Sequence, residues 1–279
     1  MAITTRDQLI DAMANNSSRI IIDKASIASQ TANSFSSLWR ATGQPGQGAI
    51  PAAAAVCTHA LTGAIQFTQQ TAPATSYLGI LENMCSNAGS TLEIHDRLMH
   101  MGGLNGTLAT AQTVTLDLNA NLGTSNLANR IGDSNYSDVQ WWLEWYTATG
   151  ATAVTATVAV TYNDGTTGNL TAVSLAATRP ASHMIPLNSL IPAAASGKYI
   201  RDVDTVTLSA TTGTAGSFGV TATRYRAANY APVLNARFTS NWADLGLPEI
   251  PNSSCLFGIL ATATTSTGAV RAAGKIIHG

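Results

Sequence analysis

The most constraining feature of this sequence is a strict two-residue alternation between residues 154 and 162. The even-numbered positions are all apolar: Val154, Ala156, Val158, Val160 and Tyr162. Because successive side chains of a β-strand point to opposite faces, this pattern predicts a strand with one buried face and one neutral, threonine-rich face. The turn sequence Asn163-Asp164-Gly165 follows directly and Leu170 resumes the apolar pattern, so we expect a β-hairpin.

Comparable patterns recur through the second half of the chain, separated by Gly, Asn, Ser and Pro. They predict eight strands, at residues 113–118, 138–146, 153–162, 170–175, 203–209, 218–225, 255–261 and 269–277. The predicted fold class is therefore mainly β, a β-sandwich or jelly-roll-like fold with an extended, partly helical N-terminal region. We expect an N-terminal arm and mixed α/β region over residues 1–110 and a β-sandwich domain over 111–279, with a single domain as the alternative.

The first hundred residues show weaker signals. Residues 5–15 place Leu9, Ile10 and Met13 on one side of a helix, with Thr4 or Thr5 as its N-cap. Pro51 followed by four alanines favours the start of a second helix over residues 51–56. Residues 77–98 are expected to form a helix and then a strand, because Leu78, Leu81 and Cys85 have helical spacing.

Charge is scarce in this chain and is missing from one long stretch. Only 10% of residues are charged, against roughly 25% in typical soluble domains, and residues 41–81 contain no Asp, Glu, Lys or Arg. We expect that this stretch lies inside the fold or that neighbouring subunits cover it, and the two expectations are not exclusive. Turn-forming residues predict a surface loop within it, and we expect that loop to form subunit contacts through Gly43, Gln44, Pro45, Gly46, Gln47 and Gly48.

Several classes of partner are not expected. The net charge of −1 gives no basic footprint for nucleic acid, and no run of about 20 apolar residues predicts a membrane span. The N-terminus lacks the apolar core of a secretory signal. Cys57, Cys85 and Cys255 are odd in number and widely spaced, which favours buried reduced thiols in a protein that folds in a cytoplasm.

No sequence motif indicates catalysis, a metal or a cofactor, so we predict a non-enzymatic protein. His95 and His100 are five residues apart, a spacing that puts them on different faces of a strand or helix. Asp96 and Arg97, between them, are expected to meet solvent or a neighbour. The pair of Cys57 and His59 lacks a placed third group. A hydrolase would be expected to gather at least some of Cys57, Glu93, His95 and Asp96 in one cleft, and this alternative stays open.

An aromatic cluster at residues 141–146 has two interpretations. In a strand, Trp141 and Trp145 share one face while Trp142 and Tyr146 share the other. Large aromatics on both faces favour a strand buried in the core or at a subunit contact, and Trp142 is our candidate for the contact. The alternative is a stacking platform for sugars, which would require Trp141 or Trp142 to be exposed.

Three segments of the chain are distinctive: Ser37-Leu38-Trp39-Arg40-Ala41-Thr42-Gly43, Leu92-Glu93-Ile94-His95-Asp96-Arg97-Leu98 and Asp138-Val139-Gln140-Trp141-Trp142-Leu143-Glu144-Trp145-Tyr146. They resemble segments of structural proteins, capsid-associated or decoration-type, of tailed bacteriophages. The resemblance implies a component of the virion, and it brings no functional residue with it.

These observations lead to one functional hypothesis with alternatives. We expect a structural component of a bacteriophage virion, a capsid decoration, cement or minor capsid protein that is assembled in the host cytoplasm. It would bind other copies of itself and major capsid or other virion proteins, and a closed homo-oligomer such as a trimer would suit icosahedral surroundings. The alternatives are a tail or neck structural protein and a carbohydrate- or receptor-binding module.

Overall fold

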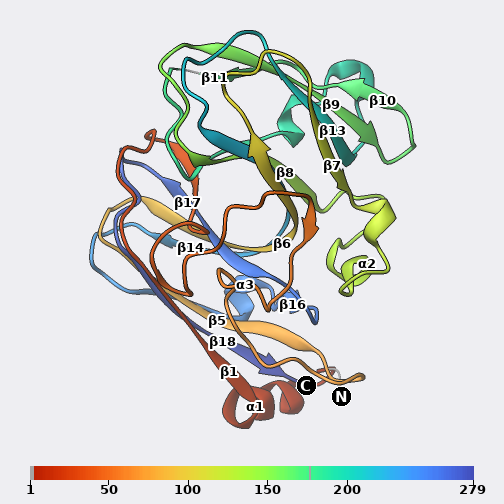
Figure 1. Cartoon of the computed structure of the whole chain (residues 1–279). Coiled ribbons are helices and arrows are strands. Elements are labelled where there is room, and N and C mark those ends of the chain that lie inside the picture. The colour runs from red at the N-terminus through yellow and green to blue at the C-terminus, as the bar shows by residue number, and fades with distance from the viewer. Residues whose placement is uncertain (1–2, 176) are drawn as a thin grey trace. The chain divides into compact units, whose positions relative to one another are not determined.

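The computed structural model describes residues 3–175 and 177–279 and shows a mainly β protein (Figure 1). The chain forms two compact units, each assembled from separate stretches. Unit 1 comprises the residues up to Ala49, Thr58–Asp96 and Tyr225–Gly279, and unit 2 comprises Ile50–Cys57 and Arg97–Arg224. We expected a domain boundary between residues 110 and 111 that would divide the chain into two consecutive segments. In the structure this position lies inside unit 2.

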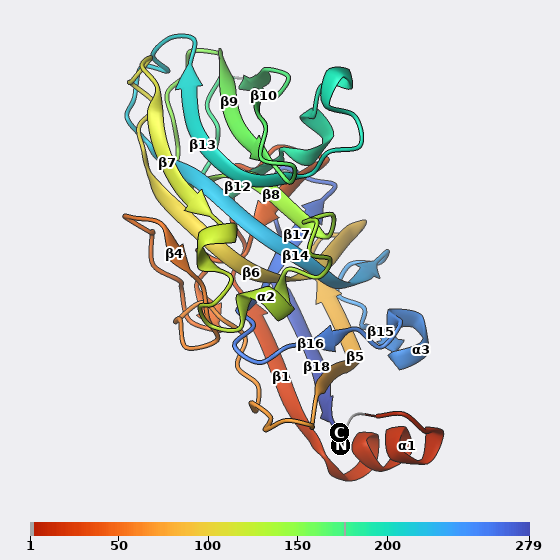
Figure 2. The same cartoon turned by 90° about the vertical axis from the view of Figure 1, so that its right-hand side faces the viewer.

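Unit 1 is built on an antiparallel sheet that includes the C-terminal strand. Its strand order is β15 (Phe238–Asn241), β5 (Ser76–Cys85), β18 (Val270–His278), β1 (Ser17–Lys24) and β3 (Gly43–Gln44), and β16 (Glu249–Ile250) also pairs with β5 (Figure 2). The alternation along β1 explains its place, because Ile20 and Ile22 are buried while Ile21 is exposed.

Unit 1 also holds a second group of strands. Here β17 (Leu256–Thr262) lies between β2 (Ser34–Ser37) and the first part of β6 (Ser90–Leu104). The core of the unit forms from the apolar residues of these strands and of the first sheet, among them Ile20, Leu38, Leu81, Leu92, Ile94, Leu260 and Ile276.

The predicted N-terminal helix is confirmed as α1 (Arg6–Asn15). The Thr5 hydroxyl accepts a hydrogen bond from the Gln8 backbone, and the Gln8 side chain accepts one from the Thr5 backbone, so the two residues form a capping box. At the other end, Lys275 Nζ donates to the carbonyl of Met13 at 2.9 Å, which satisfies one of the terminal carbonyls and places a cation at the negative end of the helix dipole.

Two predicted helices are wrong. Residues 76–85 form β5, and the pairing of Lys275 with Ile80 but of Ile276 with Leu78 leaves Gly79 as an extra residue in that strand. This β-bulge turns both Leu78 and Leu81 inward, and so produces a three-residue spacing that imitates a helix. Residues 51–56 end in β4 (Ala55–Val56), which pairs with β6, so strand pairing overrides the helix propensity of alanine.

Unit 2 contains a sheet in the order β10 (Thr167–Asn169), β9 (Val154–Tyr162), β13 (Ile200–Leu208) and β7 (Gln112–Asp117), with β11 (Val173–Leu175) also on β9. The predicted hairpin is confirmed by the pairing of β9 with β10, and the predicted apolar parity of β9 is buried. In a second group, β8 (Val139–Thr147) lies between β12 (His183–Pro186) and β14 (Ser217–Ala231). The core includes Leu116, Trp141, Leu143, Trp145, Val158, Val206, Phe218 and Val220.

The remaining helices are short. They are α2 (Leu127–Arg130), α3 (Trp242–Leu245) and the 3₁₀ turns at Asn119–Asn121, Asn188–Leu190 and Ala193–Ala195. Over the described residues, no helix has the length and apolar character needed to cross a membrane. All eight strands predicted from the sequence are present, as β7, β8, β9, β11, β13, β14, β17 and β18. The thiols of Cys57, Cys85 and Cys255 are buried, as expected.

Candidate functional site

The predicted contact loop, residues 43–48, is held in unit 1 by a buried lysine. Lys24 Nζ donates to the backbone carbonyls of Ala41 at 3.0 Å and Pro45 at 2.6 Å. Burial lowers the pKa of Lys24 to about 8. These bonds tie the loop to the end of β1, where β3 adds Gly43 and Gln44 to the sheet edge. The loop that carries no charge of its own is therefore organised around a cation from elsewhere in the chain.

A second anchor of the loop is the Trp39 side chain. Its indole Nε1 donates to Ala49 O at 2.9 Å, and the Gly48 backbone N donates to Trp39 O at 2.9 Å. A Cβ atom on Gly48 would lie 2.1 Å from the Trp39 ring, so only glycine fits there. The Arg40 guanidinium also donates to the carbonyl of Gly48. Both ends of the loop are thus fixed, and its shape is set before any partner binds.

The exposure of the loop residues differs from one to the next. Gly43, Gln44 and Gln47 are exposed, and Pro45 and Gly46 are half-buried. These five residues are accessible to a partner. Gly48 is buried under its own chain, so its assignment as a contact residue is corrected.

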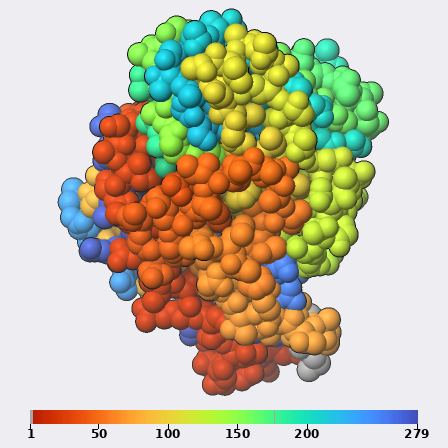
Figure 3. All heavy atoms as spheres, viewed as in Figure 1, coloured from red at the N-terminus to blue at the C-terminus, as the bar shows by residue number. Residues whose placement is uncertain are grey.

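The rest of the uncharged stretch contains both buried and exposed residues. Its larger apolar side chains are mostly buried, among them Cys57, Ile65, Phe67, Leu78 and Leu81, whereas its exposed positions are mainly Ala, Thr and Gln. Ile65 is fixed by an antiparallel bridge to Leu256. Atoms of residues 50–80, drawn in orange, lie at the surface in Figure 3. The expectation that the stretch lies inside the fold therefore holds in part, and the expectation that neighbouring subunits cover its neutral outer surface stays a prediction.

Trp142 does not lie at a contact surface, and this prediction is corrected. Its side chain is only 3% exposed, and its Nε1 donates to Thr223 Oγ1 at 2.8 Å inside unit 2. The reason is that β8 is covered on both faces, as two faces of large aromatics require. Trp141 is fully buried as well, so residues 141–146 form no exposed platform on which a sugar could stack.

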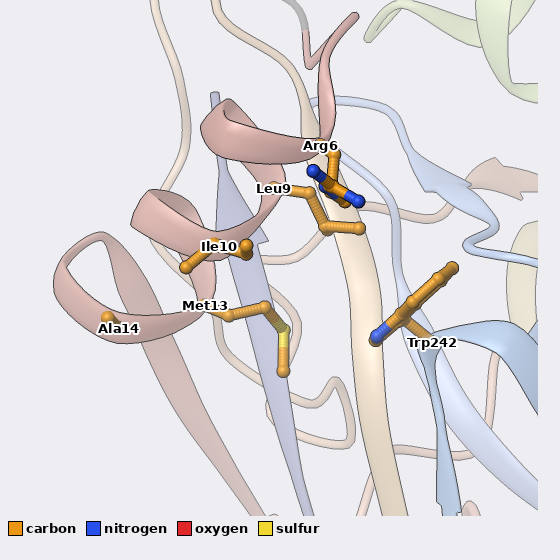
Figure 4. Close-up of a pocket in the computed structure, with 6 residues that line it drawn as sticks. All are labelled: Arg6, Leu9, Ile10, Met13, Ala14 and Trp242. Carbon is orange, nitrogen blue, oxygen red and sulfur yellow. The ribbon is translucent and has the colours of Figure 1, made fainter.

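Unit 1 has an apolar groove that the sequence did not reveal. It lies between α1 and α3, measures about 430 Å³, and is lined by Arg6, Leu9, Ile10, Met13, Ala14 and Trp242. Figure 4 shows Leu9 and Met13 extending from the helix toward Trp242. Ile10 is 58% exposed although it belongs to the predicted apolar side of the helix, and Trp242 is 44% exposed. Trp242 is the one exposed tryptophan of the five, because Trp39, Trp141, Trp142 and Trp145 are buried.

Asp96 and Arg97 are fully buried, which corrects the expectation that they meet solvent or a neighbour. In unit 1, the Asp96 carboxylate lies 3.2 Å from Arg226 Nη2 and accepts a hydrogen bond from the backbone N of Cys255 at 2.8 Å. In unit 2, Arg97 forms an ion pair with Glu144 at 2.5 Å. Each charge is compensated inside the fold.

The Arg97 guanidinium is the centre of a polar network inside unit 2. It donates to both carboxylate oxygens of Glu144, to Tyr146 Oη at 3.0 Å and to Thr221 Oγ1 at 3.1 Å, and its Nε donates to His100 Nδ1 at 2.9 Å. Burial alone would lower the pKa of Arg97, but the Glu144 carboxylate beside it raises that pKa above the usual value. Burial and Glu144 also raise the pKa of Tyr146. The Arg97 guanidinium therefore stays positively charged, and the Tyr146 hydroxyl keeps its proton, near neutral pH.

The residues considered for catalysis or metal binding are engaged in structural contacts. His95 is fully buried beside Glu93 at 2.9 Å, and burial lowers its pKa. Cys57 is buried, and its backbone carbonyl accepts from Arg130 Nη1 at 2.7 Å. Over residues 3–175 and 177–279, no three His, Cys, Asp or Glu side chains gather as a metal ion would require. The absence of catalysis and of metal stays a prediction.

Comparison with known proteins adds little to this mainly β description. No family model matches the chain, and no curated protein matches it. A structure of infectious bursal disease virus, Gt strain, is 11% identical over 94% of this chain and 81% of the other, with a TM-score of 0.20. The VP2 subviral particle of the same virus is 10% identical over 94% and 79%, with a TM-score of 0.19. Scores this low do not establish a common fold.

Proposed function

We propose that this chain is a non-enzymatic structural component of a bacteriophage virion, a capsid decoration, cement or minor capsid protein. In this proposal its strands pack as a β-sandwich or jelly-roll-like fold, and it binds copies of itself and other virion proteins. Assembly takes place in the host cytoplasm, and the product is a closed homo-oligomer such as a trimer. The resemblance of three segments to structural proteins of tailed phages motivates the choice of virion.

The proposal rests on one observation: the neutral loop of residues 43–48 is largely exposed, and hydrogen bonds from Lys24 and Trp39 hold it in one conformation. Subunit contacts require area and complementary shape, and a surface without charge avoids the cost of taking ions out of water. A loop fixed in advance by Lys24 and Trp39 loses little conformational freedom when it binds, which favours association. The neutral surface of the wider stretch, residues 41–81, extends the available area.

A carbohydrate- or receptor-binding module is the second candidate, and Trp242 is the observation that favours it. An exposed indole beside an apolar groove is a surface on which a sugar ring could stack. The groove offers few polar partners, because Arg6 is the only charged residue among the described residues that line it. Sugar recognition depends on directed hydrogen bonds as well as on stacking, and for this reason the structural role is preferred.

A charge placed in the contact loop tests the proposal. Gly46→Glu adds a carboxylate at an ordinary backbone conformation, where a Cβ meets only the methyl of Thr62 at 3.0 Å, so the subunit should fold. An unpaired charge at a dry contact costs several kcal/mol, and we expect the apparent association constant to fall by at least about tenfold, which corresponds to about 1.4 kcal/mol. Sedimentation velocity over a concentration series measures this.

Gly123→Glu is the matched control. It adds the same charge where a Cβ would meet nothing within 4 Å, and it should associate like the wild type. Circular dichroism of both variants should match the wild type. If the Gly46→Glu protein is folded and associates with wild-type affinity, the loop faces open solvent and the proposal fails at this surface.

A further inference from the structure

The groove between α1 and α3 in unit 1 leaves large apolar side chains in contact with water. Ile10 is 58% exposed and Trp242 is 44% exposed, and both line the same groove of about 430 Å³. Exposed apolar surface gathered in a concave place, and not scattered singly, is typical of a binding site. The residues that line the groove therefore define the chemistry of what it would bind.

The lining is one continuous stripe of α1 that faces a single indole. Positions 6, 9, 10, 13 and 14 follow the spacing that places side chains on one face of a helix. Trp242, the first residue of α3, lies across from this stripe (Figure 4). The helical rise puts Arg6 about 12 Å from Ala14 along the axis, a length that an extended chain of about ten carbon atoms spans. The groove is thus elongated, with its charge at one end.

Arg6 has no counterion in the described chain. Its guanidinium forms no hydrogen bond or ion pair with any of the described residues. Arg6 is also the first residue of α1, so it adds a positive charge at the positive end of the helix dipole. Asp7 follows it, but lies about 100° further around the helix and does not line the groove. This end of the groove therefore attracts an anionic group.

The size of the groove favours a small ligand over a protein. A stable protein contact uses about 20–30 residues on each side, whereas six residues line this groove. Its volume of about 430 Å³ falls in the range of about 300–1,000 Å³ that is usual for small-molecule sites. Met13 supplies a flexible thioether that adapts to the shape of an apolar chain. A narrow apolar tail with one charged end matches these features.

We propose that the groove binds a linear carboxylate of medium chain length, with its head group on Arg6 and its alkyl chain against Leu9, Met13 and Trp242. A carboxylate accepts two parallel hydrogen bonds from a guanidinium, and the chain removes the exposed indole from water. A cationic amphiphile would bury the same tail but would meet a like charge at Arg6. This site goes beyond the proposed structural role, because it shares no residue with the loop of residues 43–48.

The test is calorimetric titration of the full chain with sodium decanoate and with decyltrimethylammonium bromide, each below the concentration at which it forms micelles. Decanoate should bind with a stoichiometry of one and more tightly than the cation. Each methylene that enters the groove strengthens binding by up to about fourfold, so octanoate should bind more weakly than decanoate. Arg6→Gln should weaken decanoate binding by about threefold to fivefold, the effect of losing an exposed ion pair.

Two further variants locate the ligand. Trp242→Ala removes one wall of the groove, and decanoate binding should weaken by at least about tenfold, as expected when two methylenes lose their contact. Arg271→Gln is the matched control for Arg6→Gln. Arg271 is an exposed arginine of the same unit that lies 3.5 Å from Asp23 and does not line the groove, so this variant should bind like the wild type.

Several results would overturn the proposal. They are a wild type that binds no decanoate, equal affinity for decanoate and the cationic amphiphile, or wild-type affinity in the Arg6→Gln and Trp242→Ala proteins. A ligand-free Trp242→Ala protein that sediments as a single chain where the wild type is an oligomer would also overturn it, because the groove would then be a contact between copies. The wild-type comparison of the two amphiphiles decides even if a variant fails to fold.

Discussion

Replacing Arg97 with methionine is expected to destabilise the protein by about 3–5 kcal/mol, the loss typical of removing one member of a buried ion pair. The Glu144 carboxylate would stay behind in a fully buried position with the hydroxyls of Tyr146 and Thr221 as neutral partners. Neither hydroxyl compensates a full charge. Urea unfolding, followed by tryptophan fluorescence and circular dichroism, measures the change in the free energy of unfolding.

Two further variants identify the cause. Arg97→Met combined with Glu144→Leu removes both charges and should recover much of the loss, because the penalty comes from the orphaned carboxylate. Arg237→Met breaks an ion pair with Glu82 at 3.0 Å in which the arginine is 64% exposed, and it should cost less than about 1 kcal/mol. If the double variant is as unstable as Arg97→Met alone, the charge pair is not the source of the effect.

Asp202 is expected to make the protein less stable at neutral than at mildly acidic pH. It lies directly opposite Asp117 across β13 and β7, and its side chain is 6% exposed. Burial, aided by Asp117, raises the pKa of Asp202 to about 6 despite the hydrogen bond from Arg201 Nε at 2.8 Å. The ordinary value is 3.8. At about 1.4 kcal/mol per pKa unit, the buried carboxylate costs roughly 3 kcal/mol above pH 6.

The direction of the change in stability with pH follows from proton binding to Asp202. Between pH 4 and 6 the folded state holds a proton on Asp202 that the unfolded chain has released, so this group makes stability fall as the pH rises through that window. Asp202→Asn should therefore be more stable than the wild type at pH 7 and lose most of that advantage near pH 4. Asp204→Asn, two residues further along β13, retains Asp202 and serves as the control. Equal pH dependence of the wild type and Asp202→Asn in urea unfolding would contradict this assignment.

The parts of the fold that were predictable share a strong local pattern. The alternation of residues 154–162 specified a half-buried strand, and the sequence from Asn163 specified its turn. Prediction failed where a local pattern had a nonlocal cause. The bulge at Gly79 gives Leu78 and Leu81 a helical spacing, and the pairing partner that reveals the bulge lies some two hundred residues away in β18. Strands of two to four residues, such as β3 and β4, are too short for periodicity to show.

The position of the candidate site could be predicted from the sequence, but the contacts that hold it could not. Turn chemistry located the loop of residues 43–48, but nothing in the sequence connects it to Lys24, because that contact depends on how β1 and β3 pair. The burial of Asp96 did leave a signal. Leu92, Ile94, Asp96 and Leu98 share one parity of β6, which puts the carboxylate on the apolar face. Its partner Arg226 is 130 residues away, so the ion pair itself could not be inferred.

The central claim is that this chain works by burying its neutral surface against other subunits, and the mass of the purified protein in solution tests it most directly. Sedimentation equilibrium over a wide concentration range should give an integral multiple of the 28.8 kDa chain mass, three times that mass for a trimer, with Gly46→Glu shifted toward the single chain. A wild-type protein that stays at 28.8 kDa at every concentration would contradict the claim that the chain forms a homo-oligomer through this surface.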